Sequence, residues 1–401
     1  MEDGGRRGVV LPLLCIWVIG AGSAVLAWSM ATGFGRLLAV AVVGMLTALG
    51  SAVVARAGRA WAGLAELLAA VAGIGVGATR GVRFIGADYL AWIAVAGLLA
   101  GLALLILGTW DLLAGTRGWW RLPVGLSALI CLPLALYTLA VPLAATNSPR
   151  GPAPPTTGQT VTFRTSDGVE LSGSFTPGRN GAAIVVVPGA GSDRTGAAEQ
   201  ASVLADAGYA VLTYDPRGHG LSGGRAMEFG WAGDQDVAAA VDFLSSQAGI
   251  DPARIGALGM SMGGEEVLGA AASDLRIRAT VAEGATNRVA GDFDWLPEQY
   301  GWRGRVQQLL DVPRFALVDL FTAQPPPLTL REAVAAIAPR PVLLIAAGAV
   351  PDEQYATAHI ASGSPATVTT WVVPDAGHIG GLSTQPELWR KTVLGFFDEH
   401  L

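Results

Sequence analysis

The amino-acid sequence predicts an all-α, membrane-spanning first half followed by an α/β domain with a mostly parallel sheet. Two observations lead to this fold class. Long apolar segments recur through residues 1–146, whereas residues 159–401 alternate short β-branched runs with helical patterns. Hydrophobic residues make up 51% of the 401 residues and charged residues only 14%, a composition too apolar for an ordinary soluble protein.

Five apolar segments of the first half are each close to the ~20 residues that a helix needs to cross a bilayer. They span residues 9–28, 37–55, 61–78, 90–110 and 122–145. Backbone groups in hydrocarbon must bond to one another, so these segments are expected to be transmembrane helices. Several tryptophans lie near the segment ends, where amphipathic rings favour the headgroup region: Trp28, Trp61, Trp92, Trp110, Trp119 and Trp120. A cleavable signal peptide is the alternative for the first segment, and the role of Glu66, inside the third, is left open.

The two halves carry opposite net charge. Residues 1–150 hold ten Arg and five acidic residues, a formal +5 that leaves −11 for residues 151–401. An acidic second half repels phosphate backbones, which disfavours nucleic acid as a partner. Arg placement gives a small bias toward a cytoplasmic N-terminus, which with five crossings puts the second half outside the cytoplasm. Cys15 and Cys131, the only cysteines, allow neither a disulfide framework nor a thiolate metal site.

Residues 147–158 separate the halves as a Pro-rich linker, because proline fixes φ and removes a backbone donor. A predicted hairpin follows, residues 160–165 and 169–175 around a Ser-Asp-Gly turn. Continuous apolar runs then alternate with helical stretches, the pattern of a parallel sheet covered on both faces. The runs are residues 182–187, 210–214, 254–260, 277–282, 341–347 and 367–373.

An insertion at about residues 286–335, rich in Trp, Pro and charge, interrupts this alternation between the sixth and seventh strands. Ligands of open α/β sheets bind at the carboxyl edge of the strands. We therefore predict that the insertion is a lid over that edge. A surface excursion without function is the alternative.

Ser261 stands in the sequence Gly259-Met260-Ser261-Met262-Gly263, between a strand-like run and a helix-like run. A sharp strand-to-helix turn needs small flanking residues and raises the serine Oγ beside a helix N-terminus. The pattern alone is weak evidence, but this context makes it specific. It predicts that Ser261 is a nucleophile.

The hydroxyl needs a base, since serine is a weak nucleophile at neutral pH. Of four histidines, His378 follows the last strand in a Gly-containing loop that can reach the sheet edge, so we predict His378 as the base. A carboxylate at a strand end should orient it. Asp352 is the favoured acid, with Glu353 and Glu283 as alternatives.

Two backbone donors are expected to hold the oxyanion of the reaction. One is the N–H of Met262, directly after the nucleophile. The other is the N–H of Ala190, in the Gly-rich loop that follows the run at residues 182–187. No metal and no cofactor is expected.

Residues 160–401 resemble the α/β-hydrolase family, and in particular its dienelactone-hydrolase and serine-peptidase-like members. The motifs that carry the resemblance are "GMSMGG" around Ser261, "YDPRGHGLSGG" after the fourth strand, "IDPARIG" before the nucleophile strand and "PDAGH" ending at His378. The resemblance implies the fold and a serine nucleophile, and it implies that Asp215, Arg217 and Ser222 are structural. Two features depart from the family: Pro188-Gly189 stands where His-Gly is common, and the acid loop is one residue longer.

These observations predict a membrane-anchored serine hydrolase that cleaves a carboxylic ester through an acyl-enzyme, with an amide or a thioester as the alternative substrate class. An acyltransferase with the same triad is one alternative. A transporter or sensor membrane module with a non-catalytic binding domain is the other. The expected partners are a small-molecule or lipid ester and the bilayer of the cell membrane, while the oligomeric state is not predicted.

Overall fold

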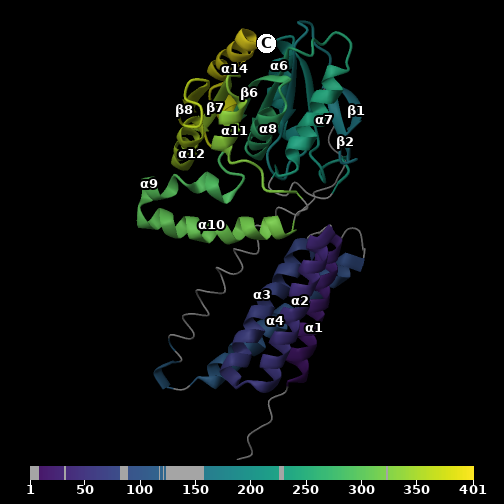
Figure 1. The fold of residues 1–401 in the computed structure, drawn as a ribbon, viewed down its shortest axis with the longest axis vertical. Helices are drawn as coiled ribbons and strands as arrows, with labels where there is room; N and C mark the ends of the chain where they lie inside the picture. Colours follow the sequence, from purple (N-terminus) through teal and green to yellow (C-terminus); the bar gives the residue numbers. More distant parts are fainter. Residues whose placement is uncertain are drawn as a thin grey trace, which may run out of the picture. The chain divides into compact units, whose positions relative to one another are not determined.

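The structure is a computed structural model that describes residues 9–30, 33–81, 89–116, 118–120, 122, 158–224, 230–321 and 324–401. The chain divides into two compact units, which are described separately (Figure 1). One comprises Met1–Ala144 with Pro313–Ala323, and the other Ala145–Val312 with Gln324–Leu401.

Among the described residues before Leu122, four helices build the first unit. They are α1 (Val10–Met30), α2 (Gly33–Arg56), α3 (Arg59–Gly81) and α4 (Tyr89–Gly115), followed by a short 3-10 turn, η1 (Gly118–Trp120). Four of the five predicted apolar segments thus lie in helices, whereas the fifth, at 122–145, falls outside the described residues except for Leu122. Among the described helices, one segment, Val95–Gly115, is long and apolar enough to cross a membrane. Val10–Val25 and Val40–Arg56 are apolar but shorter, so a multi-pass arrangement stays a prediction.

Helices α3 and α4 approach each other through glycines. A Cβ added to Gly63 of α3 would lie 2.4 Å from the backbone nitrogen of Leu112, and one added to Gly108 of α4 would lie 2.9 Å from the carbonyl oxygen of Gly63. Gly101 and Gly115, seven residues to either side of Gly108, also meet the α3 backbone. Small residues allow this close backbone packing, which is typical of helices that associate in membranes.

The described residues of the second unit form one eight-stranded sheet at its centre, in the order β1-β2-β4-β3-β5-β6-β7-β8. The hairpin of β1 and β2 is antiparallel and joins β4 in antiparallel pairing, and all other pairs are parallel. The strands are β1 (Gln159–Arg164), β2 (Glu170–Thr176), β3 (Ala183–Val187), β4 (Ala210–Tyr214), β5 (Ile255–Met260), β6 (Ile277–Glu283), β7 (Val342–Ala347) and β8 (Val368–Val373). The predicted strands and the mostly parallel sheet are confirmed, with boundaries within one or two residues.

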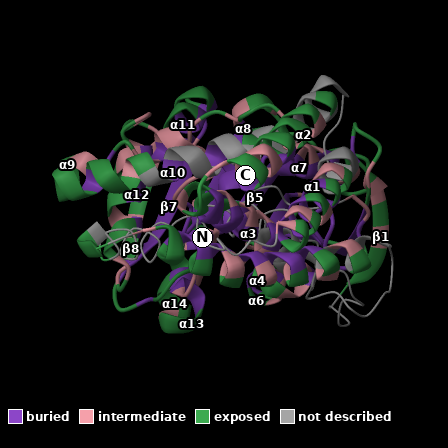
Figure 2. Cartoon of the chain, turned by 90° about the horizontal axis from the view of Figure 1, so that it is seen from below, coloured by how far each residue is buried: buried purple, intermediate pink, exposed green. Residues whose placement is uncertain are grey.

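Helices cover both faces of this sheet. One face packs against α7 (Gly233–Ser245), α8 (Met262–Ser273) and α11 (Leu330–Ile337), and the other against α6 (Ala198–Asp206) and α14 (Pro386–His400). Every residue of β3, β5 and β7 is buried, as Figure 2 shows for β5 and β7. This explains why these strands read as continuous apolar runs rather than as alternating ones.

The insertion between β6 and β7 contains η4 (Ala290–Phe293), α9 (Leu296–Tyr300) and α10 (Trp302–Phe321). Helix α11 begins inside the predicted range of 286–335, but its apolar face lies in the sheet core, so it belongs to the core and not to the excursion. One buried carboxylate joins the two ends of the excursion. Asp292 accepts hydrogen bonds from the backbone N–H groups of Arg288 and Val289 and from that of Leu330.

Candidate active site

Ser261 lies at the sharp turn between β5 and α8. Its φ of 53° and ψ of −124° are strained for a residue with a side chain. The neighbouring glycines are required by space, because a Cβ on Gly259 would lie 2.1 Å from the carbonyl oxygen of Gly263, and a Cβ on Gly263 would lie 2.4 Å from that of Pro188. The predicted nucleophile turn is therefore present.

A chain of hydrogen bonds connects Ser261, His378 and a glutamate. Ser261 Oγ lies 2.8 Å from Nε2 of His378, and Nδ1 of His378 lies 2.5 Å from Oε1 of Glu353. The second oxygen of Glu353 accepts the backbone N–H of Ala347 at 2.9 Å, which fixes the carboxylate at the end of β7. With Nδ1–H donated to the carboxylate, Nε2 is left free to accept the serine proton.

The acid position differs from the favoured prediction. Helix α12 (Pro351–Ala361) begins directly after the β7 turn, and its second residue, Asp352, points to a different partner: it accepts the hydroxyl of Tyr300 at 2.5 Å. Glu353, one of the two alternatives, takes the place next to His378. A sequence signal was available, because Glu353 stands in an i, i+3, i+4, i+7 relation to Ala356, Thr357 and Ile360, the buried face of this helix.

The charge of Glu353 acts on the base. Its hydrogen bond raises the pKa of His378 above the usual value, against the opposing effect of burial, and the negative charges of Glu265 and Glu283 add to the increase. The His378 side chain is 48% exposed whereas that of Glu353 is 4% exposed. The imidazole can therefore meet a substrate from solvent while its partner stays dry.

Glu283, the other alternative acid, ends strand β6 but does not contact His378 by a hydrogen bond. Its carboxylate accepts the backbone N–H of Gly381 at 2.8 Å and the indole N–H of Trp389 at 2.9 Å. Its carbonyl oxygen accepts the N–H of Ser261 at 2.7 Å. Burial is the largest influence on this carboxyl group and raises its pKa.

The two predicted oxyanion donors come from different elements, the first turn of α8 and the loop after β3. Met262 is the first residue of α8, where an N–H has no acceptor within the helix. The turn after β3 passes close to the nucleophile, since a Cβ on Gly189 would lie 3.3 Å from that of Ser261. Ala190 follows in this turn and is exposed. The role of both N–H groups stays a prediction.

Comparison with known proteins agrees with this geometry. Residues 178–314 match a family model described as "Serine aminopeptidase, S33", a hydrolase family. The strand order of the second unit is that of the α/β-hydrolase fold. The match indicates a hydrolase, and we call the second unit the hydrolase domain.

Individual relatives cover only parts of the chain. An uncharacterized protein of Mycobacterium tuberculosis is 40% identical over 117 residues, 28% of this chain and 41% of that protein. The thiohydrolase aneE of Aspergillus aculeatus is 36% identical over 126 residues, 30% of this chain and 40% of its own. The chain thus spans about 41% of the length of the curated relatives that it matches first. A solved esterase of Pyrococcus furiosus is 26% identical, covers 64% of this chain and 98% of its own, and has a TM-score of 0.48.

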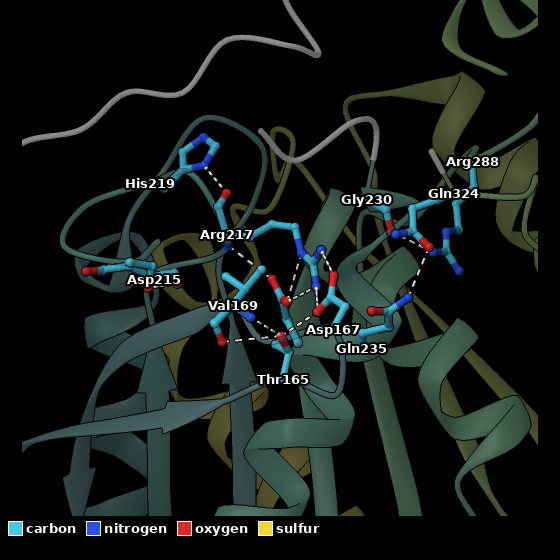
Figure 3. Close-up of polar contacts among 12 residues, drawn as sticks. Thr165, Asp167, Val169, Asp215, Arg217, His219, Gly230, Gln235, Arg288 and Gln324 are labelled. Atoms are coloured by element: carbon cyan, nitrogen blue, oxygen red, sulfur yellow. Dashed lines mark hydrogen bonds and ion pairs between the residues drawn. The ribbon is translucent and has the colours of Figure 1, made fainter. Parts of the chain in front are cut away.

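A buried polar network in the hydrolase domain supports the segment from Tyr214 to Gly224. Arg217 binds Asp167 of the β1–β2 turn, as Figure 3 shows, and it also binds Asp236 of α7. Asp215 accepts three hydrogen bonds from Arg194, one of them from its backbone N–H. Ser222 donates to the carbonyl oxygen of Asp215 and accepts the N–H of Ser172. These contacts confirm that the motif ties the loop to its neighbours.

Two further glutamates of the hydrolase domain follow Ser261 in helix α8. Glu265 and Glu266, in the first turns of α8, are both buried. Glu265 accepts the backbone N–H groups of Thr286 and Asn287, and burial raises the pKa of its carboxyl group to about 7. Within the described ranges, no three His, Cys, Asp or Glu side chains are grouped to hold a metal ion.

Proposed function

We propose that this protein is a membrane-anchored serine hydrolase that cleaves a carboxylic ester through an acyl-enzyme on Ser261. The observation that carries the proposal is the continuous hydrogen-bond chain from Ser261 through His378 to Glu353. The strained turn at Ser261 supports it, because such strain persists where the surrounding structure holds a side chain for a task.

The geometry supports the following steps. Nε2 of His378 takes the hydroxyl proton of Ser261 while Oγ bonds to the ester carbonyl carbon, whose electron pair moves onto the carbonyl oxygen. The N–H groups of Met262 and Ala190 hold this oxyanion, each worth about 3–4 kcal/mol of barrier lowering. When the oxyanion collapses, the alcohol leaves with the proton of His378. A water molecule, deprotonated by the same imidazole, then releases the acid and restores Ser261.

Glu353 has a separate part in these steps. It keeps the proton on Nδ1 and opposes the positive charge that the imidazole acquires. A carboxylate that is itself held by the N–H of Ala347 can do this without reorganisation during the reaction.

A fluorophosphonate probe tests the nucleophile. The wild-type chain should be labelled, and Ser261→Ala should be neither labelled nor active on acyl esters. Ser222→Ala is a matched control, because this serine is buried in the loop network and should leave labelling intact in the folded protein. Labelling that survives Ser261→Ala contradicts the proposal. Product analysis with an added alcohol separates hydrolysis from acyl transfer.

The proposed organisation assigns residues 1–146 to a helical membrane anchor, 147–158 to a linker and 159–401 to the catalytic domain, outside the cytoplasm. The apolar segment Val95–Gly115 and the glycine packing of α3 with α4 support the anchor. After washing membranes with alkaline carbonate, the protein should remain in the pellet. Release into the wash contradicts anchoring, and protection of the catalytic domain from added protease in intact cells contradicts the proposed side.

We also propose that the excursion between β6 and β7, at about residues 286–329, is a lid for this site. Aromatic contacts connect α9 with the helix that bears Glu353: the ring of Tyr355 lies 5.8 Å from that of Trp295 and 6.2 Å from that of Tyr300. A change in the insertion therefore reaches the helix that carries the acid. Replacement of Trp295 by Ala should alter KM for long-chain esters more than for short-chain ones, and equal changes in both contradict a lid.

A further inference from the structure

We propose that Glu283 is a positioning residue, which with Gly284 fixes the place of the His378 loop relative to the nucleophile turn. The inference rests on the proposed function and deepens it. Glu283 is the last residue of β6, between the strands that carry Ser261 and Glu353 at their ends.

The main chain of Glu283 holds the nucleophile. Its carbonyl oxygen accepts the N–H of Ser261 at 2.7 Å. Ser261 has a positive φ, a conformation that a residue with a Cβ keeps only when neighbouring contacts determine it. The hydrogen bond to Glu283 is one such contact.

The side chain of Glu283 holds the base loop. One carboxylate oxygen accepts the N–H of Gly381, three residues after His378, and the other accepts the indole N–H of Trp389 in α14. Both donors and the carboxylate are buried. Glu283 thereby connects β6, the His378 loop and α14. Because these groups are buried, their hydrogen bonds are stronger than they would be in water.

The loop needs this support because its backbone is strained on both sides of His378. Asp375 has a φ of 60° and Ile379 a φ of 51°. The second is a β-branched residue in the left-handed region, where it is an outlier. The bond from Gly381 to Glu283 anchors the loop directly after this strained residue.

Gly284 completes the joint between the two segments. It has a φ of 71°, and a Cβ added there would lie 3.0 Å from Cε1 of His378 and 3.0 Å from Cγ2 of Ile379. The imidazole and Ile379 thus rest against the backbone of Gly284. Glu283 through its carboxylate and Gly284 through its lack of a side chain together determine the position of His378.

The carboxylate also contributes charge. Three carboxylates influence His378: Glu353 through a hydrogen bond, and Glu265 and Glu283 through their charge. Removing the charge of Glu283 should therefore lower the pKa of His378, which a purely space-filling role would not do.

Glu283→Gln tests the proposal in the full-length protein. The amide has one carbonyl oxygen for two N–H donors, so either Gly381 or Trp389 loses its partner. We expect kcat to fall at least tenfold with KM changed less than threefold, and the acid limb of the kcat/KM profile to move to lower pH. Unchanged kcat together with an unmoved acid limb overturns the proposal.

Tyr209→Phe is the matched control. It removes a hydrogen bond between the buried Tyr209 and Asp398, a residue of α14 that lies nine positions after Trp389. We expect kcat within twofold of the wild type. An equal loss of kcat in both variants would mean that any loosening of α14 reduces activity, and this result also overturns the proposal.

If Glu283→Gln does not fold, Gly284→Ala tests the contact between Gly284 and the His378 loop while the Glu283 carboxylate stays intact. We expect reduced kcat with little change in KM, and wild-type kcat in a folded Gly284→Ala contradicts the proposal. Nuclear magnetic resonance titration of the imidazoles, assigned with His378→Asn, follows the pKa of His378 without turnover. A wild-type protein that neither binds the fluorophosphonate nor cleaves esters sinks the proposed function alone. An active wild type, together with wild-type kcat and an unshifted His378 titration in folded Glu283→Gln, sinks this inference.

Discussion

The helical unit and the hydrolase domain stabilise themselves by different means. In the helical unit, α3 and α4 meet backbone to backbone at Gly63, Gly101 and Gly108, and this contact depends on the absence of side chains. In the hydrolase domain, buried charged groups such as Arg194 with Asp215 hold loops against the sheet. The comparison teaches that the α3–α4 contact is sensitive to an added side chain, whereas the loops of the hydrolase domain are sensitive to the loss of a buried charge.

The largest expected effect concerns the two adjacent acids of the hydrolase domain. Glu353→Gln should reduce kcat by about 10³–10⁴-fold, because the amide no longer stabilises the imidazolium or the required tautomer. Asp352→Asn, its neighbour on the exposed side of α12, should stay within about threefold of the wild type. Steady-state kinetics on an activated ester measure both, and the reverse order would restore Asp352 as the acid.

A buried ion pair of the hydrolase domain gives the next largest effect. Asp215→Asn leaves the 4%-exposed Arg194 side chain without its counter-charge, which should cost about 3 kcal/mol, or roughly 6–12 °C in the Tm of this domain. Glu170→Gln, in the exposed pair with Arg164, should shift the Tm by less than about 2 °C. Scanning calorimetry in detergent distinguishes the two, and similar shifts would remove the contrast between buried and exposed pairs.

In the helical unit the sensitive change is the addition of a side chain. Gly63→Leu places atoms into the backbone of α4 and should destabilise this unit by about 1–3 kcal/mol while kcat stays unchanged. Gly44→Leu is the control, because a Cβ at this position meets nothing within 4 Å. Thermal unfolding followed by circular dichroism measures the difference. A loss of the proposed esterase activity in the folded Gly63→Leu protein would show that the two halves are coupled.

The smallest expected effect is a shift in the pH dependence of kcat/KM. Since Glu353 raises the pKa of His378 above about 6.5, and only the neutral imidazole is a base, kcat/KM should fall as the pH drops through that raised value. The Glu353–His378 interaction also stabilises the folded state, with the opposite pH dependence. This stabilisation is fully present below the pKa of His378 in the unfolded chain, and it is lost as the pH rises through the pKa of His378 in the folded protein. A midpoint of the acid limb below 6 would contradict the proposed pairing.

The sequence predicts the fold of the hydrolase domain well because its signals are local. Strand-length apolar runs, a turn at residues 166–168 and the glycines around Ser261 each determine their own element. The choice between Asp352 and Glu353 is different. Adjacent helical residues point about 100° apart, so the choice depends on the residue at which α12 begins, and the buried face of that helix is the signal to consult.

Two other features have no comparable signal in the sequence. Glu283 bonds to Gly381 and Trp389, about a hundred residues further along the chain, and no local pattern indicates such a contact. The assignment of α11 to the sheet core likewise depends on which surface its amphipathic face finds. Both are set by tertiary packing.

The carboxylate of Asp292, bonded to the backbone at Arg288, Val289 and Leu330, gives the excursion between β6 and β7 a closed neck. The distance that the excursion must bridge is therefore fixed, whatever lies between. A change of length or sequence inside the excursion can leave its two ends in place on the sheet, but it reaches α12 where it alters Trp295 or Tyr300. Under the proposed function, one anchored sheet would in this way carry different substrate-selecting surfaces.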